Sequence, residues 1–224
     1  MKTTHTIPLA IAIGGVIVAL AVFFSSNVHL FSPEASSGDQ SLVRAVSSAD
    51  HILGNPLAPI KIVTYSDYDC DYCKEFHTVM NRVIADRGSN GRVAWVLRQF
   101  PLTEIHENAM THAEAAECVA ATAGNDAFFA FSATLFDHQP ADPKTYGALA
   151  QQTKVPAKPF TDCYTNAATT VDERIKKDRQ NALDAGARGT PYSVLMVKDK
   201  PAEPMDGAYT YDAVIYLIDQ QSGF

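Results

Sequence analysis

Residues 60–73 read IKIVTYSDYDCDYC, and this stretch decides the fold that we expect. Pro59 to Ser66 is rich in β-branched and aromatic residues, which is typical of a strand. From Cys73 to Arg87, apolar residues recur at helical spacing, and Gly88 follows them. The pattern predicts a strand, a short turn and a helix, with a Cys-x-x-C pair at the start of the helix.

A second strand follows this helix. Residues 92–100 read RVAWVLRQF, and Pro101 stops the run because it has no N–H group to give to a sheet. The connection between the two strands is long enough for a parallel crossover. We therefore expect a β-α-β unit over this part of the chain.

The chain is predicted to be helical from about residue 104 to 187. Helical spacings occur over 106–122, 127–137, 146–153 and 172–185. Strand signals return at Tyr192–Val197 and Ala208–Thr210, and Asp212–Gln220 predicts a closing helix. The simplest arrangement is one α/β domain over residues 51–224 with an inserted all-helical subdomain.

The N-terminal residues differ from the rest. Residues 7–24 contain no charged side chain, and as a helix they would span about 27 Å, close to a hydrocarbon core of about 30 Å. Lys2 precedes this segment and the first arginine, Arg44, comes well after it. We expect a cytoplasmic tail (1–6), a transmembrane anchor (7–24), a linker (25–50) and an exported domain.

A cleaved signal peptide is the alternative for residues 7–24. Its apolar region is usually shorter, with small residues near the cleavage site, whereas Phe23 and Phe24 stand at the end of this run. We therefore favour a single-pass anchor in the cell membrane with the domain on the periplasmic or outer face. Cleavage would release a soluble form.

Composition excludes several classes of protein. The 224 residues are 46% hydrophobic and 19% charged, which is a globular composition. The formal charge is −7 without a cluster of basic residues, so we expect no nucleic-acid partner. The four cysteines all lie in the exported part, where thiols form disulfides or perform redox chemistry.

The spacing Cys70-Asp71-Tyr72-Cys73 has three interpretations. Zinc sites also use Cys-x-x-C, but Cys118 and Cys163 do not form a second such pair. A structural disulfide closing so small a loop would constrain the unfolded chain little. At a helix N-terminus, by contrast, Cys70 would become a stabilised thiolate. We favour a redox dithiol that needs no metal or organic cofactor.

Residues 50–60 (DHILGNPLAPI) and 65–74 (YSDYDCDYCK) resemble the opening of DsbA-like thiol:disulfide oxidoreductases. Gly189-Thr190-Pro191 is similar to the cis-proline loop of that family. The resemblance covers about residues 50–220 and implies a thioredoxin fold with a helical insertion. It implies that Cys70 is the nucleophile and Cys73 the resolving thiol. It also implies that Pro191 is cis and that the Thr190 backbone pairs with substrate.

One residue departs from the family pattern. The oxidases of the family commonly carry proline after the first cysteine, and Asp71 stands there. A carboxylate beside the nucleophile opposes the thiolate, so we expect the pKa of Cys70 to rise. The disulfide is then expected to be a weaker oxidant than the strongest members, whose potential is about −120 mV.

Other residues have two interpretations each. Export favours a structural Cys118–Cys163 disulfide over two buried free thiols. Asp67 is either a proton acceptor for the resolving thiol or a turn residue. Tyr72, with Tyr65 and Tyr68, forms a peptide-binding rim or belongs to the core. Three histidines, at 77, 106 and 112, are expected on the surface or in the core, with His77 facing the solvent.

The expected function is disulfide exchange with exported cysteine-containing proteins. A membrane partner, either a quinone-linked oxidase or a thiol donor, would recycle the dithiol. The first alternative is a reductase or isomerase of the same fold. The second is a tethered chaperone or binding module whose cysteines are only structural. The linker is too short and polar for the dimerisation region that the family's isomerases tend to have, so we expect a monomer.

Overall fold

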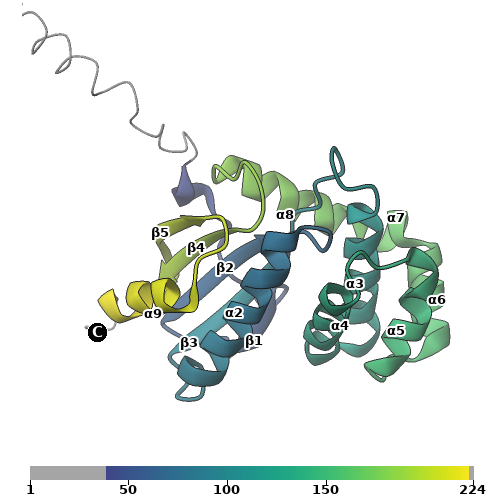
Figure 1. The fold of residues 1–224 in the computed structure, drawn as a ribbon, viewed down its shortest axis with the longest axis horizontal. Coiled ribbons are helices and arrows are strands. Elements are labelled where there is room, and N and C mark those ends of the chain that lie inside the picture. Colours follow the sequence, from purple (N-terminus) through teal and green to yellow (C-terminus); the bar gives the residue numbers. More distant parts are fainter. Residues whose placement is uncertain (1–38, 222–224) are drawn as a thin grey trace, which may run out of the picture. The chain divides into compact units, whose positions relative to one another are not determined.

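The computed structural model describes residues 39–221 (Figure 1). Within them, five strands form one sheet in the order β1-β3-β2-β4-β5. The central strand β2 is parallel to β3 and antiparallel to β4, and helix α2 connects β2 to β3. The predicted β-α-β unit is therefore confirmed. The bounds are β1 (His51–Gly54), β2 (Ile60–Ser66), α2 (Asp71–Arg87), β3 (Val93–Gln99), β4 (Tyr192–Val197) and β5 (Lys200–Asp206).

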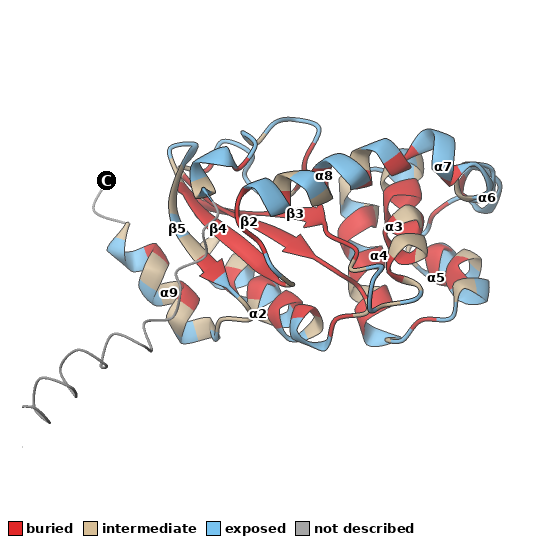
Figure 2. Ribbon diagram, turned by 90° about the horizontal axis from the view of Figure 1, so that it is seen from above, coloured by how far each residue is buried: buried red, intermediate tan, exposed pale blue. Residues whose placement is uncertain are grey.

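Helices cover both faces of the sheet (Figure 2). Because side chains alternate along a strand, Ile62 of β2 packs in one cluster with Met80 of α2 and with α9 (Tyr211–Gln220). Its neighbour Val63 packs in the opposite cluster, which includes Ala182 of α8 (Asp172–Asp184). Every residue of β2 and β3 is buried, as expected for strands covered on both sides.

The predicted helical insertion is confirmed, and it lies beside the sheet (Figure 1). It begins at Ala109, three residues later than the spacing indicated, and contains two short helices that the sequence pattern did not reveal, α6 and α7. α8, which we assigned to the insertion, packs on the sheet instead. The remaining bounds are α3 (Ala109–Ala123), α4 (Asn125–Asp137), η3 (Pro143–Thr145), α5 (Tyr146–Gln152), α6 (Ala157–Thr165) and α7 (Ala167–Thr170).

Two strand assignments differ from the sequence pattern. The strand predicted at Ala208–Thr210 is wrong, and the chain instead forms β5, with Pro201 and Pro204 inside it. Prolines are tolerated there because β5 is an edge strand. The short strand β1 was not predicted, because four residues are too few for a clear alternation.

Residues 39–50, at the end of the predicted linker, pack against the domain. The Asn181 side chain of α8 donates a hydrogen bond to the carbonyl of Leu42 (2.7 Å) and accepts one from the N–H of Arg44 (3.0 Å). Val43 is buried beside the helix. The short helix η2 (Gln40–Leu42) begins this segment.

The predicted anchor at residues 7–24 lies outside the described residues. Over 39–221, no helix is long and apolar enough to cross a membrane.

A buried ion network joins this N-terminal segment to the sheet. Arg98 of β3 is completely buried, and its Nε donates to Asp50 Oδ1 at 2.8 Å. Arg44 Nη2 lies 3.1 Å from the same oxygen and 2.8 Å from Asp178 of α8. Burial raises the pKa of Asp50, but the hydrogen bond and charge of Arg98 lower it overall. Each buried charge thus has a partner, as burial requires.

Removal of one partner tests this network. We expect Asp50→Ala to destabilise the protein by about 3–5 kcal/mol, because it leaves the buried Arg98 guanidinium without its carboxylate. The control is Asp162→Ala, which removes an exposed pair with Lys158 and should cost at most about 1 kcal/mol. Urea unfolding of the parent protein and the two variants measures their free energies of unfolding. Equal stabilities for both variants would show that the network contributes nothing.

Candidate active site

Cys70 stands at the N-terminus of α2, where the central strand turns into the helix. The first N–H groups of a helix have no partner inside it and favour an anion. Cys70 is 8% exposed and Cys73 is 1% exposed, and both are free thiols in this structure. Cys70 is therefore the sulfur that a partner molecule can reach, and Cys73 lies behind it.

The surroundings of Cys70 stabilise its thiolate. The pKa of Cys70 is lowered to about 6, first by the hydrogen bond from the Cys73 thiol. The Thr190 side chain and the backbone N–H groups of Cys73 and Tyr72 lower it further, while burial opposes them. The helix start thus has the effect that the sequence suggested.

This low pKa corrects our expectation for Asp71. We expected its carboxylate to raise the pKa of Cys70, but the hydrogen bonds around the sulfur produce a net decrease. Asp71 is exposed in the first turn of α2, where solvent screens its charge. A pKa of about 6 lies between the value of about 3.5 for the most oxidising family members and about 7 for thioredoxin.

Cys73 has the opposite properties. Burial raises the pKa of its thiol, and the neighbouring Cys70 raises it further. The backbone N–H of Asp67 donates to Cys73 Sγ at 3.4 Å. The two thiols therefore differ strongly in acidity, and at neutral pH the proton of the pair resides on Cys73.

The loop before β4 forms the other side of the site. The peptide bond between Thr190 and Pro191 is cis. The Thr190 carbonyl oxygen lies 3.3 Å from Cys70 Sγ, 120 residues away in the chain, and accepts the thiol S–H. The Pro191 carbonyl accepts the N–H of Gly207 (2.9 Å), which ties this loop to the end of β5. The structure thus brings all four residues of the family motif together.

Asp67 is a buried turn residue. Its carboxylate accepts the N–H of Asp69 (2.8 Å) and of Leu102 (2.7 Å), and it lies 2.9 Å from His106 Nδ1. Its contact with Cys73 is made by the backbone N–H and not by the carboxylate. The geometry therefore agrees with the turn interpretation of Asp67.

The predicted aromatic rim is smaller than we expected. Tyr65 and Tyr68 are buried, and the Tyr68 hydroxyl bonds to Ser132 of α4 (2.7 Å). Only Tyr72, within the motif, is exposed, at 65%. Ile105, on the loop that carries His106, is another exposed apolar residue, at 73%. No pattern in the sequence indicates Ile105, because a single exposed apolar residue in a loop has no periodicity.

The histidines lie differently from our expectation. His77 is buried between Trp95 and Phe136, with neither ring nitrogen hydrogen-bonded, so the prediction that it faces solvent is wrong. Burial lowers its pKa to about 4, and the ring acts as an apolar core residue. His106 and His112 lie beside Asp67 and Asp69, directly before Cys70. Spacing alone could not show these pairs, because about 40 residues separate their members.

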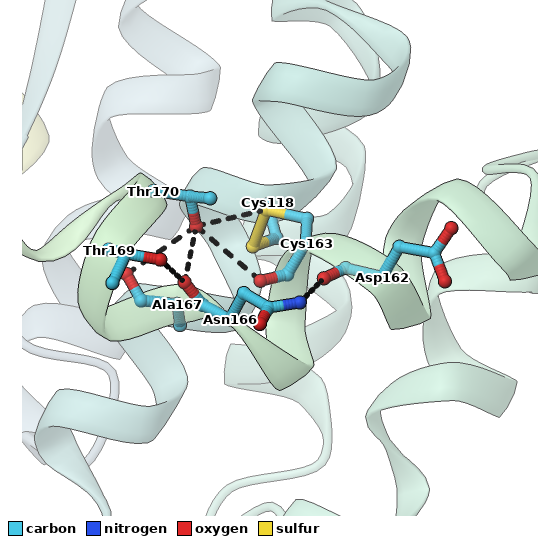
Figure 3. The surroundings of a disulfide bond; sticks show 7 residues. All are labelled: Cys118, Asp162, Cys163, Asn166, Ala167, Thr169 and Thr170. Carbon is cyan, nitrogen blue, oxygen red and sulfur yellow. Dashed lines mark hydrogen bonds between the residues drawn. A yellow bond between two sulfur atoms is a disulfide. The ribbon is translucent and has the colours of Figure 1, made fainter.

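Cys118 of α3 and Cys163 of α6 are joined by a disulfide (Figure 3). Cys118 is buried, and the Thr170 hydroxyl of α7 lies 3.8 Å from Cys163 Sγ. The bond closes a separation of 45 residues within the insertion, away from the dithiol. In the loop-entropy model, such a closure stabilises the folded state by about 4 kcal/mol.

Within residues 39–221, no three or more His, Cys, Asp or Glu side chains are grouped as they would be around a metal ion.

Comparison with known proteins gives one family. The family model described as thioredoxin matches residues 47–220. Among solved structures, α-DsbA1 of Wolbachia pipientis has a TM-score of 0.70 at 20% identity, covering 82% of this chain and 96% of that one. BdbD of Bacillus subtilis, in its oxidised form, has a TM-score of 0.67 at 22% identity, covering 84% and 97%. At these identities the likeness concerns the fold.

Curated relatives match only in part. The Na(+)/H(+) antiporter NhaA 3 of Salinispora tropica is 37% identical over 97 residues, which are 42% of this chain and 14% of the antiporter. The NhaA 1 antiporter of Mycobacterium sp. (strain KMS) is 34% identical over 132 residues, 56% of this chain and 21% of that protein. The chain therefore spans only about 14% and 21% of the length of these two relatives.

The titration of Cys70 is directly measurable. In the reduced protein, we expect thiolate absorbance near 240 nm to be present at pH 8 and to disappear as the pH falls through about 6, because the lowered pKa keeps Cys70 ionised above that value. Cys70→Ser should abolish this transition, and Cys118 and Cys163 do not contribute because they are paired. A midpoint of 8.5 or above would contradict the assignment.

Proposed function

We propose that this chain, which belongs to the thioredoxin family, is a thiol:disulfide oxidoreductase that acts through Cys70 and Cys73. The observation that carries the proposal is the asymmetry of the pair. Cys70 is 8% exposed and its pKa is lowered to about 6, whereas Cys73 is only 1% exposed and its pKa is raised. A structural cysteine pair does not need this difference, but exchange chemistry does.

The oxidising direction proceeds in two displacements. A substrate thiolate attacks Cys70 Sγ, the Cys70–Cys73 bond breaks, and Cys73 takes the electron pair and then a proton. A second substrate thiolate attacks the substrate sulfur of the mixed disulfide and releases Cys70 as a thiolate. Two substrate thiols are oxidised, and the enzyme pair gains two electrons. The low pKa of Cys70 favours this step, because a more acidic thiol leaves faster.

Thr190 and Tyr72 are the proposed substrate contacts. The Thr190 carbonyl lies beside Cys70 Sγ. A substrate peptide whose cysteine is bonded to Cys70 would therefore run in an extended form along the Thr190 loop. Tyr72, in the first turn of α2 beside Cys70, is 65% exposed and offers apolar surface to such a peptide. These contacts are to backbone and to apolar groups, which suits many different cysteine-containing proteins.

The proposed substrates and location rest on the uncharged apolar segment near the N-terminus. We propose that residues 7–24 anchor the chain in the cell membrane and that the domain acts on exported proteins in an extracytoplasmic compartment. A quinone-linked oxidase or a thiol donor in that membrane would recycle the dithiol. Thiol exchange requires only the two sulfurs, so the proposed reaction needs no metal or organic cofactor.

Asp71 supports a second candidate within the same chemistry. A reductase or isomerase needs a more reducing dithiol than a strong oxidase. The Cys70 pKa of about 6 is higher than that of the most oxidising family members, and Asp71 stands where the family's oxidases commonly carry proline. The direction of electron flow is therefore determined by the redox potential of the pair.

This potential is the first test. We expect equilibration with glutathione to give a value between about −270 and −180 mV, because the Cys70 thiolate is less stabilised than in the strongest oxidases. Asp71→Pro should shift the potential toward more oxidising values. The control variant is Glu75→Ala, at an exposed site one helical turn further along α2, and it should leave the potential unchanged. A value at or above about −120 mV would contradict the proposed tuning.

Activity is the second test. The protein should catalyse the reduction of insulin by dithiothreitol. Cys70→Ser should reduce the rate to background, and Cys73→Ser should accumulate a mixed disulfide because the resolving thiol is missing. The double variant Cys118→Ala/Cys163→Ala is the control, and its folded fraction should remain active. Full activity in Cys70→Ser would instead favour a tethered chaperone or binding module.

A further inference from the structure

Two acids and two histidines converge on the turn before Cys70. Asp67 is 1% exposed, and its Oδ2 lies 2.9 Å from Nδ1 of His106, which comes from the loop between β3 and α3. Asp69 Oδ2 lies 3.4 Å from Nδ1 of His112, a buried residue of α3. The proposed exchange mechanism uses none of these four side chains.

The two carboxylates create an electrostatic difficulty for Cys70. Asp67 and Asp69 lie within three residues of the sulfur and are partly or fully buried, where charges are screened weakly. Negative charges at this distance oppose a thiolate. A positive charge near the turn would remove this opposition.

His106 is placed to provide that charge. The Asp67 carboxylate only accepts hydrogen bonds, from the N–H groups of Asp69 and Leu102. The contact with His106 therefore requires a proton on Nδ1, and the ring can take a second proton on Nε2. The His106 side chain is 22% exposed, so this proton exchanges with solvent.

We propose that His106 is a positioning residue for the dithiol. Asp67 holds the His106 imidazolium, and its positive charge offsets the negative charge of the turn and stabilises the Cys70 thiolate when Cys70 acts as the leaving group. This inference rests on the proposed function. His106, which lies outside the Cys-x-x-C motif, would then help to set the redox potential of the pair and the rate at which Cys70 leaves as a thiolate.

The charges around His106 favour its protonated form. Burial lowers the pKa of His106, but the hydrogen bond with Asp67 and the charges of Asp67, Asp69 and Cys70 raise it overall. The interaction between two groups is reciprocal, so a Cys70 thiolate that favours the imidazolium is itself favoured by it. Around it, His112 pairs with Asp69. On the same loop, Glu104 is paired with Arg179 of α8.

His106 also has a structural contact, which an experiment must separate from its charge. The hydrogen bond to Asp67 ties the loop to the turn, and loss of that bond alone could move Cys70. His106→Asn is the suitable variant, because the asparagine amide can replace Nδ1 as donor but carries no charge. His138→Asn is the matched control, at an exposed histidine whose Nδ1 lies 2.9 Å from the Thr134 carbonyl.

The first measurement uses the unchanged protein. NMR titration of His106 should give a higher midpoint in the reduced form than in the Cys70–Cys73 disulfide form, because only the reduced form has a thiolate nearby. The control histidine, His138, should show no difference between the two redox forms. Equal midpoints for His106 in the two redox states would overturn the proposal.

The second measurement uses the variants. In His106→Asn, alkylation of Cys70 at pH 5.5 should slow about two- to fivefold, and the potential should become more reducing, because the thiolate loses a nearby positive charge. His138→Asn should match the parent. A folded His106→Asn protein with unchanged alkylation rate and potential would show a purely structural role. Insulin reduction is assayed separately, so absence of activity would refute the proposed function without bearing on this charge coupling.

Discussion

The carboxylate of Asp67 holds the turn on which the site depends. It accepts N–H groups from its own turn and from the loop after β3, so it joins the ends of the two parallel central strands. The backbone N–H of the same residue reaches Cys73 Sγ. One buried residue thus fixes where the strand stops, where α2 begins and how the resolving thiol is oriented. The reactive sulfur then needs only the helix N-terminus and the Thr190 loop to complete its surroundings.

Residues whose pattern is local could be predicted from the sequence. The β2–α2–β3 unit, β4, and α9 have clear periodicity, and the Cys-x-x-C pair and Thr190-Pro191 belong to a recognisable motif. What the sequence could not show are contacts between distant residues. His106 meets Asp67 only because the loop after β3 folds back over the turn, and β5 forms despite two prolines because its outer edge has no partner strand.

The pKa of Cys70 shows why a single residue adjacent in the sequence is a poor guide to the acidity of a thiol. Asp71 is adjacent in the chain, but its side chain is exposed, whereas the hydrogen bonds that lower the pKa come from Cys73, the Thr190 side chain and the helix backbone. Several short contacts outweigh one screened charge. The buried pairs at Arg98 and Asp50 follow the same rule in the scaffold, where each charge is satisfied by groups far apart in sequence.

The arrangement of the two thiols has a consequence for damage by peroxide. Cys70 is the more acidic and the more exposed of the two thiols, so its thiolate is the first to be oxidised to a sulfenic acid. Further oxidant converts a sulfenic acid irreversibly to sulfinic and sulfonic acids. Cys73 lies within hydrogen-bonding reach behind it and is shielded from the same reagent. Condensation of the sulfenic acid with this second thiol releases water and forms a disulfide. The product of an oxidative lesion is therefore the oxidised state of the pair itself, so the site is protected from overoxidation by its own geometry.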